Sequence, residues 1–336
     1  MLKKMFQDMK DKKILWPTVA LLSICLINFF SIPNFFNIVV KDGHLFGSVI
    51  DILNRSSVLV IMSIGMTLVI ATGGIDISVG AVAAISGAVA CTLIAAGQSL
   101  FVAVTAALLV CMVCGIWNGL LVAKLGIQCM VGTLILMIVG RGIAMLITDG
   151  QIVTVTSESY SYLANGFLFG LPFSLYITAF VTITILFFVR KTAYGLFLEA
   201  AGTNPNATKF AGINATNIIF IAYVISGVTA GISGLLISSN IKAADSNNAG
   251  HWKELDAILA TVIGGTSMMG GRAYIGGTII GALFIQSITT TIYAMGVPPE
   301  ITLIVKAFVI IVVTLLQSDQ FRMMFSKQYK RERLTT

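Results

Sequence analysis

The chain has 336 residues, of which 57% are hydrophobic and only 10% are charged, and its formal net charge is +7. Soluble domains carry about 25% charged residues, so this composition, with a mean hydropathy of +0.95, excludes an ordinary soluble protein. The basic residues cluster beside apolar segments, so the positive charge does not indicate a nucleic-acid partner. The composition predicts an all-α polytopic membrane protein whose outer surface contacts membrane lipid.

Ten apolar segments follow one another along the chain. A bilayer core of about 30 Å needs roughly 20 residues of helix, and only the eighth segment is clearly too short. We keep it as a crossing because its omission would place the basic C-terminal tail outside, against the positive-inside rule. The prediction is about ten transmembrane helices in one domain at 14–316. The segments lie at 14–32, 56–72, 79–97, 100–123, 127–147, 171–189, 217–238, 255–264, 275–295 and 301–316.

The placement of Lys and Arg predicts that both chain ends lie in the cytoplasm. With that orientation, fifteen of the 21 basic residues fall in cytoplasmic segments and four in external ones. The basic segments at 1–13 and 317–336 would then be cytoplasmic, as would the long connection at 190–216. The polar segment at 239–254 would be an external loop.

A polar break separates the second apolar segment from the third. Gly73 and Gly74 permit backbone conformations that end a helix, and Asp76 and Ser78 follow at once. At membrane depth, irregular backbone and charge are tolerated only against protein or a water-filled cavity. The break therefore predicts part of a polar translocation pathway. Alternatively, Asp76 or Ser78 caps the helix that begins near residue 79.

A second glycine break follows the short eighth segment. It contains Gly264, Gly265, Thr266 and Ser267, with two more glycines at 270–271. Glycine-interrupted spans in two halves of a transporter indicate its pathway. We therefore predict an internal pseudo-repeat and place this second break on the same pathway.

Further polar side chains lie within the apolar segments. Asn118 and Gln286 either face the pathway or form hydrogen bonds between helices. Arg141 lies well inside the fifth segment, and we expect it to pair with a carboxylate, for which Asp76 is a candidate, or with backbone carbonyls. In the external loop, Glu254 and Asp256 either belong to a solute-receiving surface or place favourable charge at the start of the next helix.

The cytoplasmic connection at 190–216 contains a short predicted helix. Asn204 is a suitable N-cap, Pro205 a suitable first residue and Gly212 a suitable residue just beyond the end. Such a weakly charged helix with an apolar Phe210 is either a docking face for another protein or folds back on its own bundle.

The chain lacks the sequence patterns of an enzyme. It has no G-x-x-x-x-G-K-[ST], H-E-x-x-H or G-x-S-x-G pattern, and its two histidines, His44 and His251, lie in separate external segments. We predict no catalytic residue, no metal site and no cofactor. Energy for uphill transport would come from a partner or an ion gradient.

In combination, these motifs resemble the membrane permeases of bacterial ATP-binding cassette (ABC) sugar importers, in the ribose/galactose/arabinose/xylose branch. The stretches that carry the resemblance are 65–80, 117–119, 133–134, 140–142, 199–214, 254–258 and 264–271. Within this family, the stretches at 41–55, 149–154 and 244–250 are most similar to galactofuranose permeases.

The resemblance implies an ABC importer permease fold in the bacterial cytoplasmic membrane and the import of a monosaccharide, galactofuranose or another hexose or pentose. It implies three partners: a cytoplasmic ATPase that binds ATP and Mg²⁺, an extracytoplasmic sugar-binding protein and a second permease copy. It assigns the 190–216 connection as the ATPase contact. The alternative is an ion-coupled secondary transporter of a small polar solute that uses Asp76 and Arg141. The residues implied in ATPase coupling are Glu199, Ala200, Gly202, Thr203, Asn204, Gly212 and Asn214.

Overall fold

The computed structural model describes residues 12–32, 34–41 and 43–317. The predicted basic segments at 1–13 and 317–336 therefore lie almost entirely outside the described residues. Helices make up most of the described part, and each of its strands is only two or three residues long. The mostly helical fold that the composition predicts is confirmed there.

Each of the ten predicted apolar segments contains a helix, but the structure does not establish ten crossings. Within the described residues, seven helices are long and apolar enough to cross a membrane: α2, α3, α5 with its continuation η1, α6, α8, α11 and α13. Helix α4 has 17 residues and α12 only 11, about 17 Å at 1.5 Å per residue. Helix α12 alone cannot cross the bilayer core, so ten crossings and cytoplasmic termini remain predictions. The bounds are α2 (Lys12–Ser31), α3 (Ser48–Ala71), α4 (Val79–Ala95), α5 (Leu100–Gly119), the π-helix η1 (Leu120–Lys124), α6 (Cys129–Ile147), α8 (Phe173–Lys191), α11 (Ala215–Ile241), α12 (Lys253–Ile263), α13 (Ile275–Ala294) and α14 (Pro299–Gln317).

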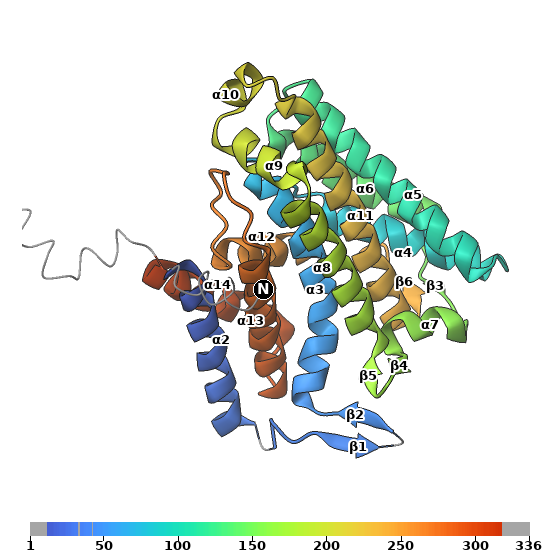
Figure 1. Cartoon of the computed structure of the whole chain (residues 1–336). Coiled ribbons are helices and arrows are strands. Elements are labelled where there is room, and N and C mark those ends of the chain that lie inside the picture. The colour runs from blue at the N-terminus through green and yellow to red at the C-terminus, as the bar shows by residue number, and fades with distance from the viewer. Residues whose placement is uncertain (1–11, 33, 42, 318–336) are drawn as a thin grey trace, which may run out of the picture.

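Short elements mark the two ends of the bundle. Helices α9 (Ala193–Thr203) and α10 (Pro205–Phe210) lie at one end, and two hairpins with α7 (Glu158–Asn165) lie towards the other (Figure 1). On the predicted orientation, the α9–α10 end faces the cytoplasm. The strand pairs, all antiparallel, are β1 (Val39–Lys41) with β2 (His44–Phe46), β3 (Val153–Thr154) with β6 (Ala243–Ala244), and β4 (Phe167–Leu168) with β5 (Leu171–Pro172).

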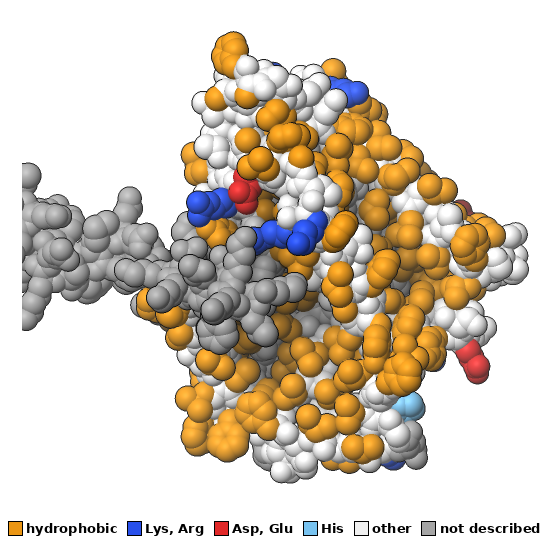
Figure 2. All heavy atoms as spheres, viewed as in Figure 1, with side chains coloured by type: hydrophobic (Ala, Val, Ile, Leu, Met, Phe, Trp, Pro, Cys, Tyr) orange, Lys and Arg blue, Asp and Glu red, His pale blue; other side chains and the backbone are white. Residues whose placement is uncertain are grey.

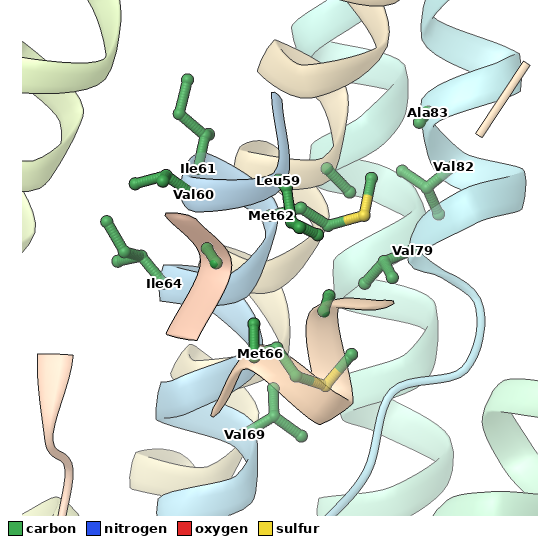
Figure 3. Close-up of a cluster of buried hydrophobic side chains, with 14 of the residues drawn as sticks. Leu59, Val60, Ile61, Met62, Ile64, Met66, Val69, Val79, Val82 and Ala83 are labelled. Atoms are coloured by element: carbon green, nitrogen blue, oxygen red, sulfur yellow. The ribbon is translucent and has the colours of Figure 1, made fainter. Parts of the chain in front are cut away.

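Helix α3 forms the centre of the bundle. In its membrane-length window 78% of the residues are buried, against 28% or less in α2, α5, α6 and α8. Its side chains pack on both sides, with Val60 and Ile64 on one side and Met62 towards Val79 and Val82 of α4 (Figure 3). From Val58 onwards α3 is apolar almost all round, as expected of a buried core helix, whereas Asp51 and Arg55 in its first turns pair with each other outside the core.

Small residues allow α11 to pack closely against α3, α4 and α5. A side chain on Gly234 would place its Cβ 2.2 Å from the Ala83 carbonyl oxygen of α4, and one on Gly227 would come within 2.6 Å of the Cys111 carbonyl oxygen of α5. Only glycine permits backbones to approach this closely, which is the usual packing mode between membrane helices.

The outer helices expose large apolar side chains. Phe101 is 79% exposed, Leu146 78% and Phe180 72%, and hydrophobic side chains cover most of the face seen in Figure 2, with few charges between them. An apolar surface of this extent is unfavourable in water and rare on soluble monomers, but it can pack against the acyl chains of lipid. The surface therefore supports a membrane location.

Candidate functional site

The first glycine break buries a carboxylate in a cluster of hydrogen-bond donors. Helix α3 ends at Ala71, Gly73 has a φ of +80°, and α4 begins at Val79. The Asp76 side chain, 1% exposed, accepts hydrogen bonds at Oδ1 from Ser78 Oγ (2.6 Å) and Ser78 N (3.1 Å). Asp76 lies within the short non-helical segment at 72–78, three residues before the start of α4.

Two distant helices complete the cluster. Asn118 of α5 donates from Nδ2 to Asp76 Oδ1 at 3.3 Å and to Ser78 Oγ at 2.8 Å. Ser226 of α11 donates from Oγ to Asp76 Oδ2 at 2.9 Å. The structure therefore brings Asp76, Ser78 and Asn118 together as predicted candidates, and it adds Ser226, which the sequence did not distinguish from other hydroxyl residues in apolar helices.

Neither Asp76 nor Ser78 caps α4 in the predicted way, because neither side chain accepts from a backbone N–H of the first turn of this helix. Ser78 occupies the N-cap position of α4, but its side chain makes no capping hydrogen bond. Asp76 instead accepts from the Ser78 backbone N–H, the short-range bond by which aspartate stabilises a turn before a helix. Thr133 of α6 also holds the break in place, because its Oγ1 accepts a hydrogen bond from Ile77 N at 3.2 Å.

Arg141 does not pair with Asp76, which corrects that part of the prediction. Its Nη1 donates to the carbonyl oxygens of Ser246 (3.3 Å), Asn247 (3.4 Å) and Ala249 (2.5 Å). The backbone-carbonyl alternative is therefore correct, and Arg141 fastens the 239–254 loop to α6. Partial burial raises the pKa of Asp245 in this loop, but hydrogen bonds from Asn248 and Asn247 and the Arg141 charge outweigh it and leave the pKa below its usual value.

The 239–254 loop continues into α12, and the first turn of α12 packs against the first turn of α4. A Cβ on Gly80 would lie 2.6 Å from the Gly250 carbonyl oxygen and 2.2 Å from Glu254 Oε2. Glu254 and Asp256 both lie in the first turn of α12, so the prediction of favourable dipole placement holds. Two short helices therefore start side by side within the bundle, each preceded by non-helical backbone.

Sequence reasoning missed the partner of Asp256. Lys306 of α14 donates to both Asp256 carboxylate oxygens at 3.1 and 3.2 Å, and both side chains are buried. The available signal was a lysine within one apolar segment and a carboxylate at the start of another, because charges at membrane depth usually pair. Gln286 of α13, also buried, makes its described hydrogen bond to Thr290 of the same helix at 3.3 Å.

The second glycine break lies against the 190–216 connection, which we call the coupling loop because the resemblance assigns it as the ATPase contact. Gly264 packs on α13, where an added Cβ would lie 2.4 Å from Thr278 N, and Thr266 Oγ1 accepts from Tyr274 N at 3.2 Å. Gly265 and Ser267 line a cavity of about 430 Å³. Residues of α9 form its other wall: Leu196, Glu199, Ala200 and Thr203.

The two breaks and the coupling loop meet at one point. Gly271 N donates to the Ala71 carbonyl oxygen at 2.9 Å. A Cβ on Gly270 would lie 2.8 Å from the Gly202 carbonyl oxygen and 2.9 Å from Gly73 N. A displacement of α9 would therefore be transmitted directly to both breaks.

The coupling loop contains the predicted helix and one more. Asn204 Oδ1 accepts from Ala207 N at 3.0 Å at the start of α10, Pro205 is its first residue, and Gly212 follows its end with a φ of +81°. Asn214 caps α11 in the same way, accepting from Asn217 N at 3.2 Å. Helix α9 was not predicted. It packs on α8 and α11, yet Leu196 is 70% exposed and Phe210 of α10 is 93% exposed.

Comparisons with known proteins agree with this architecture. The chain matches the family described as "Branched-chain amino acid transport system / permease component" over residues 48–314. It is 49% identical over 315 residues to the galactofuranose transporter permease protein YtfT of Escherichia coli (strain K12), covering 92% of each chain. It is 38% identical over 297 residues to the fructose import permease protein FruF of Bifidobacterium longum (strain NCC 2705), covering 87% of this chain and 83% of that protein.

A third relative is the ribose import permease protein RbsC of Escherichia coli (strain K12), with 35% identity over 322 residues, 95% of this chain and 96% of that protein. No solved structure matches the chain significantly. The resemblance stated from the sequence motifs is confirmed. The chain belongs to the branched-chain amino acid transport system / permease component family, and it is a multi-pass inner-membrane permease subunit rather than an enzyme.

Proposed function

We propose that the chain is the permease subunit of an ABC importer for a monosaccharide, galactofuranose or a related hexose or pentose. The observation that carries the proposal is the identity of 49% over 92% of each chain to a permease named for galactofuranose. The family's description names branched-chain amino acids, but relatives that align along most of this chain are named for sugars. Sugar is therefore the better supported substrate class.

The partners follow from that class of transporter. A cytoplasmic ATPase subunit would bind ATP and Mg²⁺, so this chain would need no cofactor, and an extracytoplasmic binding protein would deliver the sugar. A second permease copy would complete the pathway. Helices α9 and α10 are the proposed ATPase contact, because Leu196 and Phe210 are exposed there and because Gly202 and Glu199 touch the second break.

The two breaks are the proposed moving parts of the pathway. A neutral sugar needs hydrogen-bonding groups along its route, and the cluster of Asp76, Ser78 and Asn118 supplies them within the bundle. The residues proposed for the pathway are Gly73, Gly74, Asp76, Ser78, Asn118, Gly264, Gly265, Thr266, Ser267 and Gln286. Arg141 acts on the pathway only through the external loop that it fastens.

Reconstitution tests the proposal. The permease is inserted into liposomes with its ATPase and binding protein, and uptake of labelled D-galactose, D-ribose, D-fructose, L-arabinose and L-leucine is compared. We expect uptake of at least one sugar that requires ATP and persists with ionophores. An ATPase variant unable to hydrolyse ATP is the control. Uptake of leucine alone would reverse the substrate class, and sugar uptake by the permease alone that ionophores abolish would favour the ion-coupled alternative.

A further inference from the structure

A cavity of about 270 Å³ lies between the first glycine break and the coupling loop. That volume is near the lower end of small-molecule pockets in proteins. Its walls come from five parts of the chain: the break, the π-helix η1, the first residue of α6, helix α10 and the first turns of α11. The lining residues include Thr72, Gly73, Val122, Cys129, Lys209 and Tyr223.

The Tyr223 hydroxyl is the least expected feature of this cavity. The side chain is fully buried, and its Oη has no hydrogen-bond partner among the described residues. It lies directly beneath the break, because a Cβ on Gly74 would come within 2.6 Å of it. Since buried hydroxyl groups in proteins are nearly always hydrogen-bonded, an unpartnered one on a residue that lines a cavity points to a ligand with its own polar groups.

Another part of the cavity wall has an unusual backbone. Helix α5 continues after Gly119 as the five-residue π-helix η1, and Val122 and Ala123 of this element line the cavity. Single turns of π-helix occur frequently at functional sites. This one begins two residues after Asn118, which donates a hydrogen bond to Asp76, so the cavity adjoins the buried polar cluster.

The chemistry of the lining fits a small neutral polyol. Val122, Ala123 and Ile219 present apolar surface, which can cover the C–H face of a sugar ring. Hydroxyl groups of Thr72, Thr216 and Tyr223 can bind its oxygens. Lys209 is the single charged residue among the described lining residues, and the absence of a carboxylate from that set makes the lining a poor match for a cation.

We propose that this cavity is a monosaccharide site on the cytoplasmic side of the permease, where the Tyr223 hydroxyl hydrogen-bonds the sugar as it leaves. The inference rests on the proposed function and adds a location and a specific contact to it. Pro205 and Lys209 belong to α10, so the departing sugar touches the helix that we assign to the ATPase contact.

Cys129 provides a reporter within the cavity, since it lines the wall and is half-buried. The other four cysteines, Cys25, Cys91, Cys111 and Cys114, are replaced by alanine. In the purified permease–ATPase complex in nanodiscs, the alkylation rate of Cys129 by N-ethylmaleimide is measured with increasing D-galactose, D-ribose, D-fructose or L-arabinose. At about twice its Kd, the bound sugar should slow alkylation about threefold, because protection follows 1 + [L]/Kd.

Tyr223→Phe removes only the hydroxyl and should move the protection curve to roughly tenfold higher sugar concentration. Tyr194→Phe is the matched control, because Tyr194 is buried in α9 and donates to the Ile218 carbonyl oxygen at 3.2 Å outside the cavity. If Tyr223→Phe assembles poorly, Ala123→Leu fills the cavity instead and should abolish protection.

The site is refuted if no sugar slows Cys129 alkylation, or if Tyr223→Phe and Tyr194→Phe give the same protection curve. Protection by leucine without protection by any sugar also refutes it. The uptake assay separates this result from the proposed function: uptake without protection removes only the site, whereas protection without ATP-driven uptake leaves a sugar site in a different kind of transporter.

Discussion

The two glycine breaks look alike in sequence but differ in their surroundings in the structure. The first, between α3 and α4, buries Asp76 among donors from the break itself and from two helices, α5 and α11. The second, between α12 and α13, leaves Ser267 exposed and places Gly265 beside α9. A glycine-rich interruption of an apolar sequence therefore identifies where a helix ends, whereas its neighbours in space decide whether it encloses polar groups or forms a surface.

The helices beside the breaks are also held differently. The turn before α4 contains a carboxylate, Asp76, that is satisfied by hydrogen bonds alone. The first turn of α12 contains a carboxylate, Asp256, that is paired with the buried Lys306 of α14. Asp76 is therefore stabilised by several weak hydrogen bonds, and Asp256 mainly by one strong ion pair. Substitutions at these positions should differ in how much they lower the free energy of unfolding.

The largest effect is expected at the ion pair. Lys306→Met leaves the Asp256 carboxylate buried without its main cation, and breaking a buried pair from one side typically costs about 3–5 kcal/mol of the free energy of unfolding. Thermal unfolding in detergent measures the loss. The double variant Asp256→Leu/Lys306→Met should recover most of it, because neither member of the buried pair is left without its counterion, and Lys253, the other cation near Asp256, is partly exposed. A double variant less stable than Lys306→Met would show that the pair is not the main restraint on α12.

A smaller but still large effect is expected at Asp76. Asp76→Ala removes the acceptor of the Ser78 and Ser226 hydroxyl groups, which can rotate towards other acceptors, whereas Asn118 still donates to Ser78 Oγ. The net cost should be near that of one unsatisfied buried group, about 1–3 kcal/mol of the free energy of unfolding. We expect a lower unfolding temperature and the loss of ATP-driven uptake per folded complex.

Ser267→Ala is the matched change at the second break. Ser267 is exposed, so the free energy of unfolding should change by less than about 0.5 kcal/mol. Equal unfolding temperatures for Asp76→Ala and Ser267→Ala would remove the difference that we draw between the two breaks.

The tight packing of the second break gives the next prediction. Gly264→Ala places a Cβ 2.4 Å from Thr278 N of α13, and overpacking of this kind costs about 1–3 kcal/mol. Gly276→Ala on α13 meets no atom within 4 Å and should be neutral or slightly stabilising, because alanine favours helix over glycine. Thermal unfolding compares the two, and a Gly264→Ala protein as stable as Gly276→Ala would contradict the close approach of α12 and α13.

The sequence predicted those features whose signals are local. Asn204, Pro205 and Gly212 lie within nine residues and define α10 by capping rules alone, and Gly73 to Asp76 end one helix and prepare the next. The partners of Arg141 could not be read, because they are carbonyl groups more than 100 residues away that any residue type provides. Helix η1 was missed because Leu120–Lys124 has the same apolar pattern as the helix it continues.

The smallest expected effect tests how the coupling loop touches the second break. Glu199 Oε1 accepts from Ala273 N at 3.4 Å, a long hydrogen bond near the protein surface. Glu199→Gln keeps an acceptor there, whereas Glu199→Ala removes it. The unfolding temperature should be unchanged in both, since the contact is weak. ATP hydrolysis stimulated by the sugar-loaded binding protein should fall about fivefold in Glu199→Ala, which corresponds to about 1 kcal/mol, and remain near wild type in Glu199→Gln.

Glu158→Ala in α7, at the other end of the bundle, is the control. If Glu199→Gln loses as much stimulation as Glu199→Ala, the charge of Glu199 acts on the ATPase directly, and its hydrogen bond to the second break does not transmit the signal.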